Sequence, residues 1–432
     1  MHRLNPYDNF LRRAIRSVFT PLVLLRGATR SALASALPAV ESAGEAARAG
    51  TRGLIFTSGW TFGAIITAAM VIAWGAEAAQ FFISRGMALA VLAWLQTLPE
   101  FAVEAQIAYT AGRNPEYLHF VTANFTGSLR LFVGFGWPMI YFVHAFFNRK
   151  RNKGLPEIRM GGDDAATIFF LYPALAYFTV IWWKGTLTIA DGIILIAIYM
   201  SYLALLQFLP PQELEDDQEL GLVPRTIVHM PRGLRIASIL LLFAVGGSVL
   251  WLCAKPFLET LQGLALAVGV PAFVFIQWVA PFVSEFPEKV SAFYWARTPK
   301  KAPMAFMNMV NSSFSQWTLL TGLIPFVYCW SAGRVAPVVF DAHQRTEILL
   351  TIVQSLLGAM LLSNLVFRWW EAVVLFVLWF AQLIVPGIRE EILWVYAGWV
   401  ILEAANLIRD RKHFAVFPAF FSLVRRHVLK RT

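Results

Sequence analysis

Two short stretches decide the fold: Thr97-Leu98-Pro99-Glu100 and, 188 residues later, Glu285-Phe286-Pro287-Glu288. Each lies inside a long apolar segment. A carboxylate in hydrocarbon is costly, and a proline inside a helix leaves a carbonyl of the preceding turn without its donor. Two such broken, acidic segments predict a cation site inside a membrane.

The composition is that of a polytopic membrane protein. The chain has 432 residues, of which 58% are hydrophobic and 14% charged, and its mean hydropathy is +0.60. A soluble domain carries about 25% charged residues. The sequence contains no zinc-ligand spacing, phosphate-binding loop or nucleophile elbow, so we expect no enzyme activity and no cofactor. The net charge of +10 lies mostly in loops and tails, which favours anionic lipid headgroups as partners of the basic tails, and not nucleic acid.

The hydropathy pattern predicts an all-α protein of about 10–11 transmembrane helices. The candidate spans are 54–76, 86–112, 117–147, 165–184, 187–209, 234–254, 260–296, 302–330, 346–367, 369–386 and 391–408. The predicted domains are a basic amphipathic N-terminal segment (1–53), a first transmembrane repeat (54–209), a cytoplasmic linker (210–233), a second repeat with an extra C-terminal helix (234–408) and a basic C-terminal tail (409–432).

Loop charges predict the orientation. If the loop after the first span is cytoplasmic, the cytoplasmic loops and the C-terminal tail together hold 20 Lys and Arg residues against 6 in the opposite loops. We therefore expect an integral protein of the plasma (inner) membrane. The N-terminal tail conflicts with this bias, because its arginines start outside. It either hides an unrecognised crossing, lies in the membrane interface as an amphipathic helix, or is a disordered basic tail.

The two Pro-Glu stretches belong to an inverted repeat. Each is followed on the next helix by Asn-x-x-x-Ser, and five crossings separate the copies, so they have opposite orientation. In the first copy, helical spacing places Thr97, Glu100 and Glu104 on one face, and Asn124 and Ser128 one turn apart. The second copy has Ser284, Glu285 and Glu288 with Asn308 and Ser312. Carboxylate, hydroxyl and amide oxygens are the ligands that Ca²⁺ prefers. A single Pro-Glu pair is also explained by a helix kink, but two copies at inverted positions favour an ion site.

At these residues the chain resembles the sodium/calcium exchanger family, the cation/calcium antiporters with two inverted α-repeats. The matching stretches are Gln96-Thr97-Leu98-Pro99-Glu100, Asn124-Phe-Thr-Gly127-Ser128, Ser284-Glu285-Phe286-Pro287-Glu288 and Asn308-Met-Val-Asn311-Ser312. The resemblance implies two inverted five-helix repeats. It implies that Glu100 and Glu288 are the central metal ligands, with Thr97, Ser128, Ser284 and Ser312 as secondary ligands.

Several positions depart from the pattern of that family. The Asn or Asp expected four residues after each motif serine is Phe132 in the first repeat and Gln316 in the second. Two positive residues, Arg130 and Lys289, lie near the motifs and are predicted to tune their charge. A fixed cation can replace a bound sodium electrostatically. Clustered carboxylates suit proton carriage, and Glu104 and Glu285 add two to the motif pair.

The sequence therefore predicts a secondary-active cation antiporter that exchanges Ca²⁺ against Na⁺ or H⁺ by alternating access. Its partners would be the lipid bilayer and these inorganic cations. The alternative is a non-transporting membrane scaffold or sensor descended from an exchanger, since Arg130 and Lys289 are unusual near a cation site. An intramembrane enzyme has no support, because the sequence shows no His/Glu metal cluster or Ser/Lys dyad.

Overall fold

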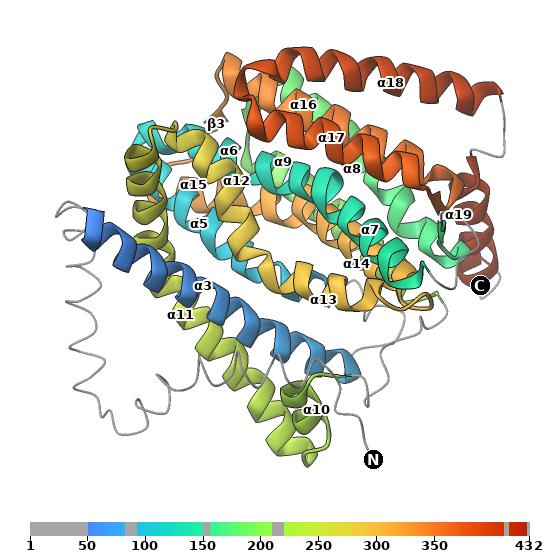
Figure 1. The fold of residues 1–432 in the computed structure, drawn as a ribbon, viewed down its shortest axis with the longest axis horizontal. Helices are drawn as coiled ribbons and strands as arrows, with labels where there is room; N and C mark the ends of the chain where they lie inside the picture. The colour runs from blue at the N-terminus through green and yellow to red at the C-terminus, as the bar shows by residue number, and fades with distance from the viewer. Residues whose placement is uncertain (1–50, 83–92, 150–155, 210–219, 410–413, 430–432) are drawn as a thin grey trace.

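The computed structural model describes residues 51–82, 93–149, 156–209, 220–409 and 414–429. Within these ranges the chain forms a bundle of helices with two short β-ribbons, as Figure 1 shows. Six of the described helical segments are long and apolar enough to cross a membrane. The all-α membrane fold is thus confirmed. The count of 10–11 crossings stays a prediction, because several of the remaining helices are short or broken.

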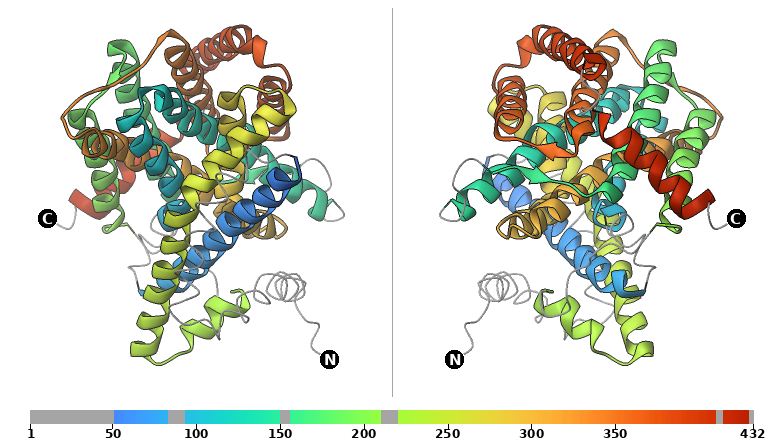
Figure 2. Two further views of the ribbon diagram at one scale, coloured as in Figure 1. Left: turned by 90° about the vertical axis from the view of Figure 1, so that its left-hand side faces the viewer. Right: turned by 90° about the vertical axis from the view of Figure 1, so that its right-hand side faces the viewer.

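The helices of the two halves follow one another with short connections. The first half comprises α3 (Thr51–Ala79), α5 (Leu98–Arg113), α6 (Leu118–Leu131), α7 (Trp137–Asn148), α8 (Ala165–Lys184) and α9 (Ile189–Leu206). The second comprises α10 (Leu222–Val228), α11 (Arg232–Val268), α12 (Ala272–Ser284), α13 (Phe286–Ala296), α14 (Ala302–Ser315), α15 (Thr321–Ala332), α16 (Ala342–Leu361), α17 (Trp369–Ile384), α18 (Arg389–Arg409) and α19 (Val416–Val424). The long helices α3 and α11 lie side by side and extend away from the rest of the bundle (Figure 2).

Two antiparallel ribbons join the halves. β1 (Ile158–Arg159) pairs with β4 (Val366–Phe367), and β2 (Thr186–Leu187) pairs with β3 (Val338–Val339). Since β1 precedes α8 and β4 follows α16, the first ribbon places the start of α8 beside the end of α16. β2 follows α8 and β3 precedes α16, so the second ribbon places the end of α8 beside the start of α16. These equivalent helices therefore run in opposite directions, as an inverted repeat requires.

A short π-helical turn interrupts the same point of each half. Phe132–Gly136 lies between α6 and α7, and Gln316–Leu320 lies between α14 and α15. Each begins eight residues after the motif asparagine of its half. Single π turns inside α-helices mark functional sites more often than chance. The segments around these turns are almost entirely buried, and the indole rings of Trp137 and Trp317 are almost fully enclosed.

One predicted helix boundary is wrong. The sequence placed a loop near Lys255, between spans 234–254 and 260–296, whereas α11 runs without interruption for 37 residues through Pro256. A single proline removes one backbone hydrogen bond, and a continuous apolar sequence on both sides keeps the helix intact. The helix ends instead at Gly269, whose φ of +71° places it in the left-handed region that favours glycine.

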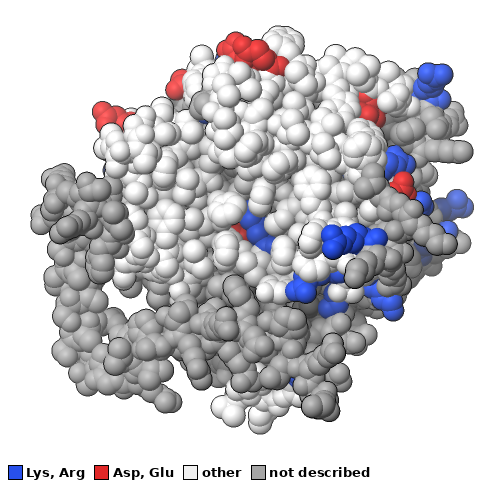
Figure 3. Space-filling view, in the orientation of Figure 1, with Lys and Arg blue, Asp and Glu red and all other residues white. Residues whose placement is uncertain are grey.

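The outer surface is suited to lipid. Large apolar side chains such as Leu241 (63% exposed), Leu266 (82%) and Val377 (55%) project from α11 and α17. In Figure 3 most of the visible face is uncharged apart from a small charged spot near its centre, and Lys and Arg gather toward the side of α19. Exposed aliphatic side chains in this number are expected where the solvent is hydrocarbon. The chain is thus an integral membrane protein.

The predicted tails and linker are described only in part. The N-terminal amphipathic segment lies outside the described residues except for the first turn of α3, and so does the acidic run at 213–217. Within the predicted linker the structure has α10, and within the predicted C-terminal tail it has α19. Phe420 of α19 stacks on Phe169 of α8 with ring centroids 3.7 Å apart, so this helix is packed against the bundle.

Candidate functional site

The two Pro-Glu stretches start new helices inside the bundle. Pro99 and Pro287 occupy the second positions of α5 and α13, where a proline has no hydrogen bond to lose. The chain breaks just before them, at Thr97 and Glu285. The break places Glu100 and Glu288 in the first turn of their helices. Free backbone N–H groups at a helix start favour negative charge at that point.

The carboxylate of Glu100 has partners from both halves. Asn124 of α6 donates from Nδ2 to Glu100 Oε1 at 2.5 Å, and the Ser284 hydroxyl of α12 donates to Glu100 Oε2. The same Asn124 Nδ2 donates to Glu104 Oε2 at 2.8 Å. All four side chains are buried. Asn124 thus connects the motif glutamate to its neighbour one turn along α5.

The second half holds its carboxylates differently. Ser312 of α14 donates to Glu288 Oε1. Glu285 Oε1 accepts from the Ser128 hydroxyl and from Gln316 Nε2 at 2.8 Å. Ser128 Oγ also lies 2.5 Å from Gln316 Oε1, so its one proton is shared between two acceptors. The bond from Ser128 to Glu285 crosses from the first half to the second, as the bond from Ser284 to Glu100 crosses back. These hydrogen bonds bring most of the predicted residues together between the halves.

Two predicted ligands are not brought to a glutamate. Thr97 donates from Oγ1 to the Trp94 carbonyl at 2.8 Å, because Thr97 sits at the break before α5 and not within the helix. Asn308 donates from Nδ2 to Gln96 Oε1 at 3.1 Å. Asn308 therefore does not repeat the contact that Asn124 makes.

The site contains buried oxygens that have no hydrogen-bond partner among the described residues. They are Glu104 Oε1, Asn124 Oδ1, Glu288 Oε2 and Asn308 Oδ1. A buried polar atom without a partner costs about 1–3 kcal/mol, so each such atom calls for an explanation. Within the described ranges, His, Cys, Asp and Glu form no group of three or more that is arranged around one metal position. A cation held here would therefore need amide and hydroxyl oxygens beside its carboxylates.

The two predicted charge-tuning residues face different partners. Lys289 Nζ lies 2.5 Å from Glu285 Oε2, and both side chains are buried. Arg130 points away from the site, with Nη2 at 2.5 Å from Glu347 Oε2 on α16. The predicted tuning of Glu100 and Glu288 by Arg130 thus has no contact to support it. Two residues beyond Ser128, Arg130 lies on a different face of α6.

Arg130 belongs to a second buried network that the sequence did not predict. Glu347 accepts from Arg130, from Arg389 Nη1 at 2.6 Å and from Gln277 Nε2 at 2.8 Å. Arg130 Nη1 also donates to Gln382 Oε1 at 3.1 Å. The sequence placed Arg389 in a loop, because it lies just before the last apolar segment. The signal that could have found this network is Gln277, a polar residue within an apolar span.

Comparison with known proteins agrees with the geometry. The profile of the family described as sodium/calcium exchanger protein matches residues 53–208 and 238–386. The crystal structure of the H⁺/Ca²⁺ exchanger CAX superposes with a TM-score of 0.80 at 28% identity, over 97% of this chain and 98% of that one.

Two more distant structures share the fold. The sodium-calcium exchanger NCX_Mj matches with a TM-score of 0.51 at 14% identity, over 76% of this chain and 97% of that one. Native YfkE matches with a TM-score of 0.53 at 17% identity, over 75% of this chain and 89% of that one. No curated protein matches the sequence. With most of its length matched by the family profile and the inverted halves meeting at their two Pro-Glu stretches, the chain belongs to the sodium/calcium exchanger family.

Proposed function

We propose that this protein is a secondary-active antiporter that exchanges Ca²⁺ for H⁺ by alternating access. The observation that carries the proposal is the pair of hydrogen bonds that cross between the halves, from Ser284 to Glu100 and from Ser128 to Glu285. A site made by both halves is opened to one side or the other when the halves rock. Alternating access requires that coupling between site and movement.

The Ca²⁺ ligands we propose are Glu100 and Glu288, aided by Ser284, Asn124 and Ser312. Each of these three neutral residues already donates to one of the two glutamates. Ca²⁺ takes oxygen from carboxylates, amides and hydroxyls in flexible geometry. Rotation of the Ser and Asn side chains would turn their oxygens toward the ion, and the unpartnered Glu288 Oε2 is free to join them.

The proton as counter-ion follows from the charge of the site. Glu100, Glu104, Glu285 and Glu288 are buried, and the described residues supply one ion-pair partner for the four, Lys289, which pairs with Glu285. Buried carboxylates without a cation are strongly disfavoured. When Ca²⁺ leaves, protons would neutralise the three carboxylates that have no such partner, Glu100, Glu104 and Glu288. The similarity to CAX, whose title gives H⁺ and Ca²⁺ as its ions, supports this choice.

The test is Ca²⁺ flux in proteoliposomes that hold the purified full-length protein. A pH gradient is expected to drive Ca²⁺ uptake, and a Na⁺ gradient of equal size is expected to drive far less. Uptake under the Na⁺ gradient alone would show that the counter-ion is Na⁺. No flux under either gradient by folded protein would favour the scaffold or sensor.

Glu100→Gln and Glu288→Gln are each expected to reduce the flux to background. Glutamine keeps the size and one acceptor oxygen of the side chain but removes the charge that a divalent ion needs. Glu259→Gln on α11 is the matched control, because that side chain is 40% exposed and pairs only with Lys255 in the described structure. Normal flux in Glu100→Gln or Glu288→Gln would disprove the ligand assignment.

We also propose the finer location and domain limits that the sequence suggested. The protein would lie in the plasma (inner) membrane, with repeats at 54–209 and 234–408 and basic tails at anionic headgroups. Protease accessibility of tags at each terminus in inside-out vesicles tests the orientation.

A further inference from the structure

Four of the positions that depart from the pattern of the exchanger family lie together in the structure. Lys289 Nζ is 2.5 Å from Glu285 Oε2 and 5.3 Å from the centre of the Phe132 ring. Gln316 Nε2 donates to the other carboxylate oxygen, Glu285 Oε1, at 2.8 Å. All four side chains are buried. Residues from both π turns and from the break before α13 thus form one cluster around Glu285.

Lys289 provides a positive charge inside this cluster. Its ammonium is a compact monovalent cation, held by a carboxylate on one side and by the face of an aromatic ring on the other. Within the described ranges, it is the one cation that contacts a carboxylate of the transport site. Because it is attached to α13, it is not released when the site opens.

The surroundings of Glu285 suit a small cation. Ser128 Oγ contacts Glu285 Oε1 and lies 2.5 Å from Gln316 Oε1, so carboxylate, hydroxyl and amide oxygens come together there. These are the types of oxygen with which proteins bind hard cations. A buried carboxylate without a positive partner is strongly disfavoured, so another cation would have to take the place of the ammonium if Lys289 were absent.

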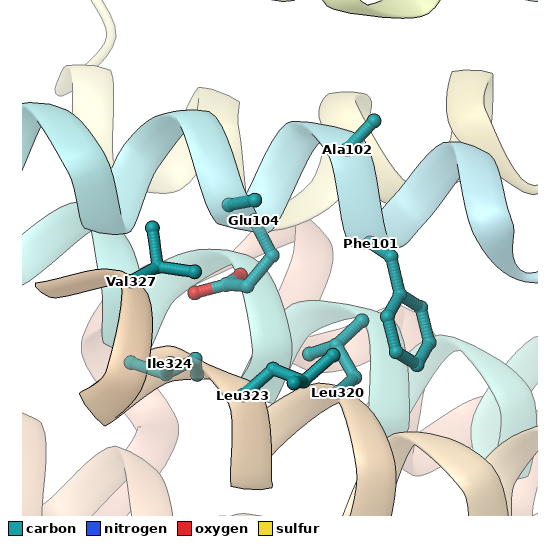
Figure 4. A pocket seen from close by; sticks show the side chains of 8 residues that line it. Phe101, Ala102, Glu104, Leu320, Leu323, Ile324 and Val327 are labelled. Atoms are coloured by element: carbon teal, nitrogen blue, oxygen red, sulfur yellow. The ribbon is translucent and has the colours of Figure 1, made fainter. Parts of the chain in front are cut away.

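The pocket next to the site offers little to such an ion. It has a volume of about 250 Å³ and lies between α5 and α15. Glu104 is the one charged residue of its lining, and Figure 4 shows the apolar residues around it: Phe101, Ala102, Leu320, Leu323, Ile324 and Val327. The exposed surface of the pocket is almost entirely apolar, and an apolar wall cannot replace the hydration shell of Na⁺.

We infer that Lys289 determines the ion specificity of the antiporter. Its ammonium holds the place that a monovalent metal ion would take at Glu285, so Na⁺ is excluded and one Ca²⁺ is bound at Glu100 and Glu288. This inference rests on the proposed function and adds to it the residue by which Na⁺ is refused as a counter-ion.

The test is Ca²⁺ binding to the purified full-length protein in detergent, measured by calorimetry at alkaline pH, where protons compete least for the carboxylates. Each measurement is made with Na⁺ and again with the bulky organic cation N-methyl-D-glucamine as the only monovalent salt. The parent is expected to bind Ca²⁺ equally well in both. Lys289→Met is expected to bind Ca²⁺ about tenfold more weakly in Na⁺, because Na⁺ held at Glu285 repels the divalent ion. Equal affinities in the two salts for Lys289→Met would overturn the inference.

Three further variants tie the effect to the cluster. The double variant Lys289→Met with Glu285→Gln has no carboxylate for Na⁺ and is expected to bind Ca²⁺ equally well in both salts. Na⁺ sensitivity in the double variant would overturn the inference, because Na⁺ would then bind elsewhere. Lys289→Arg keeps the positive charge and is expected to behave like the parent. Lys255→Met, at a side chain on α11 that is 72% exposed, is the matched control.

The parent protein decides the question even if Lys289→Met fails to fold. Ca²⁺ binding by the parent that is about tenfold weaker in Na⁺ would overturn the inference, because Lys289 would then not exclude Na⁺. Failure of the proposed function gives a different result. A parent that binds Ca²⁺ equally well in both salts but shows no proton-driven flux would refute the antiport and still support the exclusion of Na⁺ by Lys289.

Discussion

The buried ion pair between Lys289 and Glu285 allows a quantitative test of the site. The pair lies within α13 and the break before it, with Nζ and Oε2 2.5 Å apart and both side chains almost fully enclosed. Glu285 also accepts from Ser128 and Gln316, while Lys289 has the ring of Phe132 at 5.3 Å. The glutamate therefore keeps hydrogen bonds if the lysine is removed. If the glutamate is removed, the lysine keeps the contact with the Phe132 ring but has no salt bridge among the described residues.

These contacts determine the expected size of each effect. Removing one partner of a buried pair costs about 3–5 kcal/mol of unfolding free energy. Lys289→Met is expected at the lower end, because Ser128 and Gln316 still donate to Glu285, and Glu285→Gln at the upper end. The double variant removes both charges and is expected to lose about 1 kcal/mol, since replacing a whole buried pair is often neutral. The coupling energy, which is the sum of the two single losses minus the loss of the double variant, is then about 7 kcal/mol.

The assay is equilibrium unfolding in mixed micelles with SDS, followed by tryptophan fluorescence, for the parent, the two single variants and the double variant. A matched control is available on α11. Lys255 and Glu259 have the same four-residue spacing, but their charged atoms are 3.9 Å apart and their side chains 72% and 40% exposed. Lys255→Met and Glu259→Gln are expected to show a coupling of about 0.5 kcal/mol or less.

The result that would refute this reasoning is additivity. If the double variant at Lys289 and Glu285 loses the sum of the single losses to within about 0.5 kcal/mol, the two charges do not depend on each other. An equal coupling at the exposed control pair would also refute it, because burial would then have no part in the effect.

Three further outcomes are expected. Glu347→Gln leaves Arg130 and Arg389 buried without a carboxylate and should lower the free energy of unfolding by about 3–5 kcal/mol in the SDS assay, whereas a loss under 1 kcal/mol would mean that the arginines find other partners. Gly127→Ala would place its Cβ 1.7 Å from the Gln277 carbonyl oxygen and should separate α6 from α12, seen as a reduced yield of folded protein in size-exclusion chromatography; a normal yield would contradict the close packing. Ca²⁺ affinity measured by calorimetry should fall as the pH is lowered, because protons compete for the same carboxylates, and a pH-independent affinity would count against proton exchange.

Much of the fold follows from local sequence. The apolar segments predict helices, and the prolines at 99 and 287 predict where two of them break. The repeated Asn-x-x-x-Ser predicts which helix faces are polar. The continuous helix through Pro256 was not predicted, because a lysine beside a proline is as typical of a loop as of an exposed helical face.

The sequence by itself determined that this is a membrane protein with two inverted, acidic, broken helices, since hydropathy, helical spacing and proline geometry act over a few residues. Only the tertiary structure decided the partners: Ser284 with Glu100, Lys289 with Glu285, and Arg130 with Glu347 instead of the transport site. Two of these three pairs join residues more than 150 positions apart. Their contacts depend on how whole helices pack, and many packings are compatible with the same local pattern.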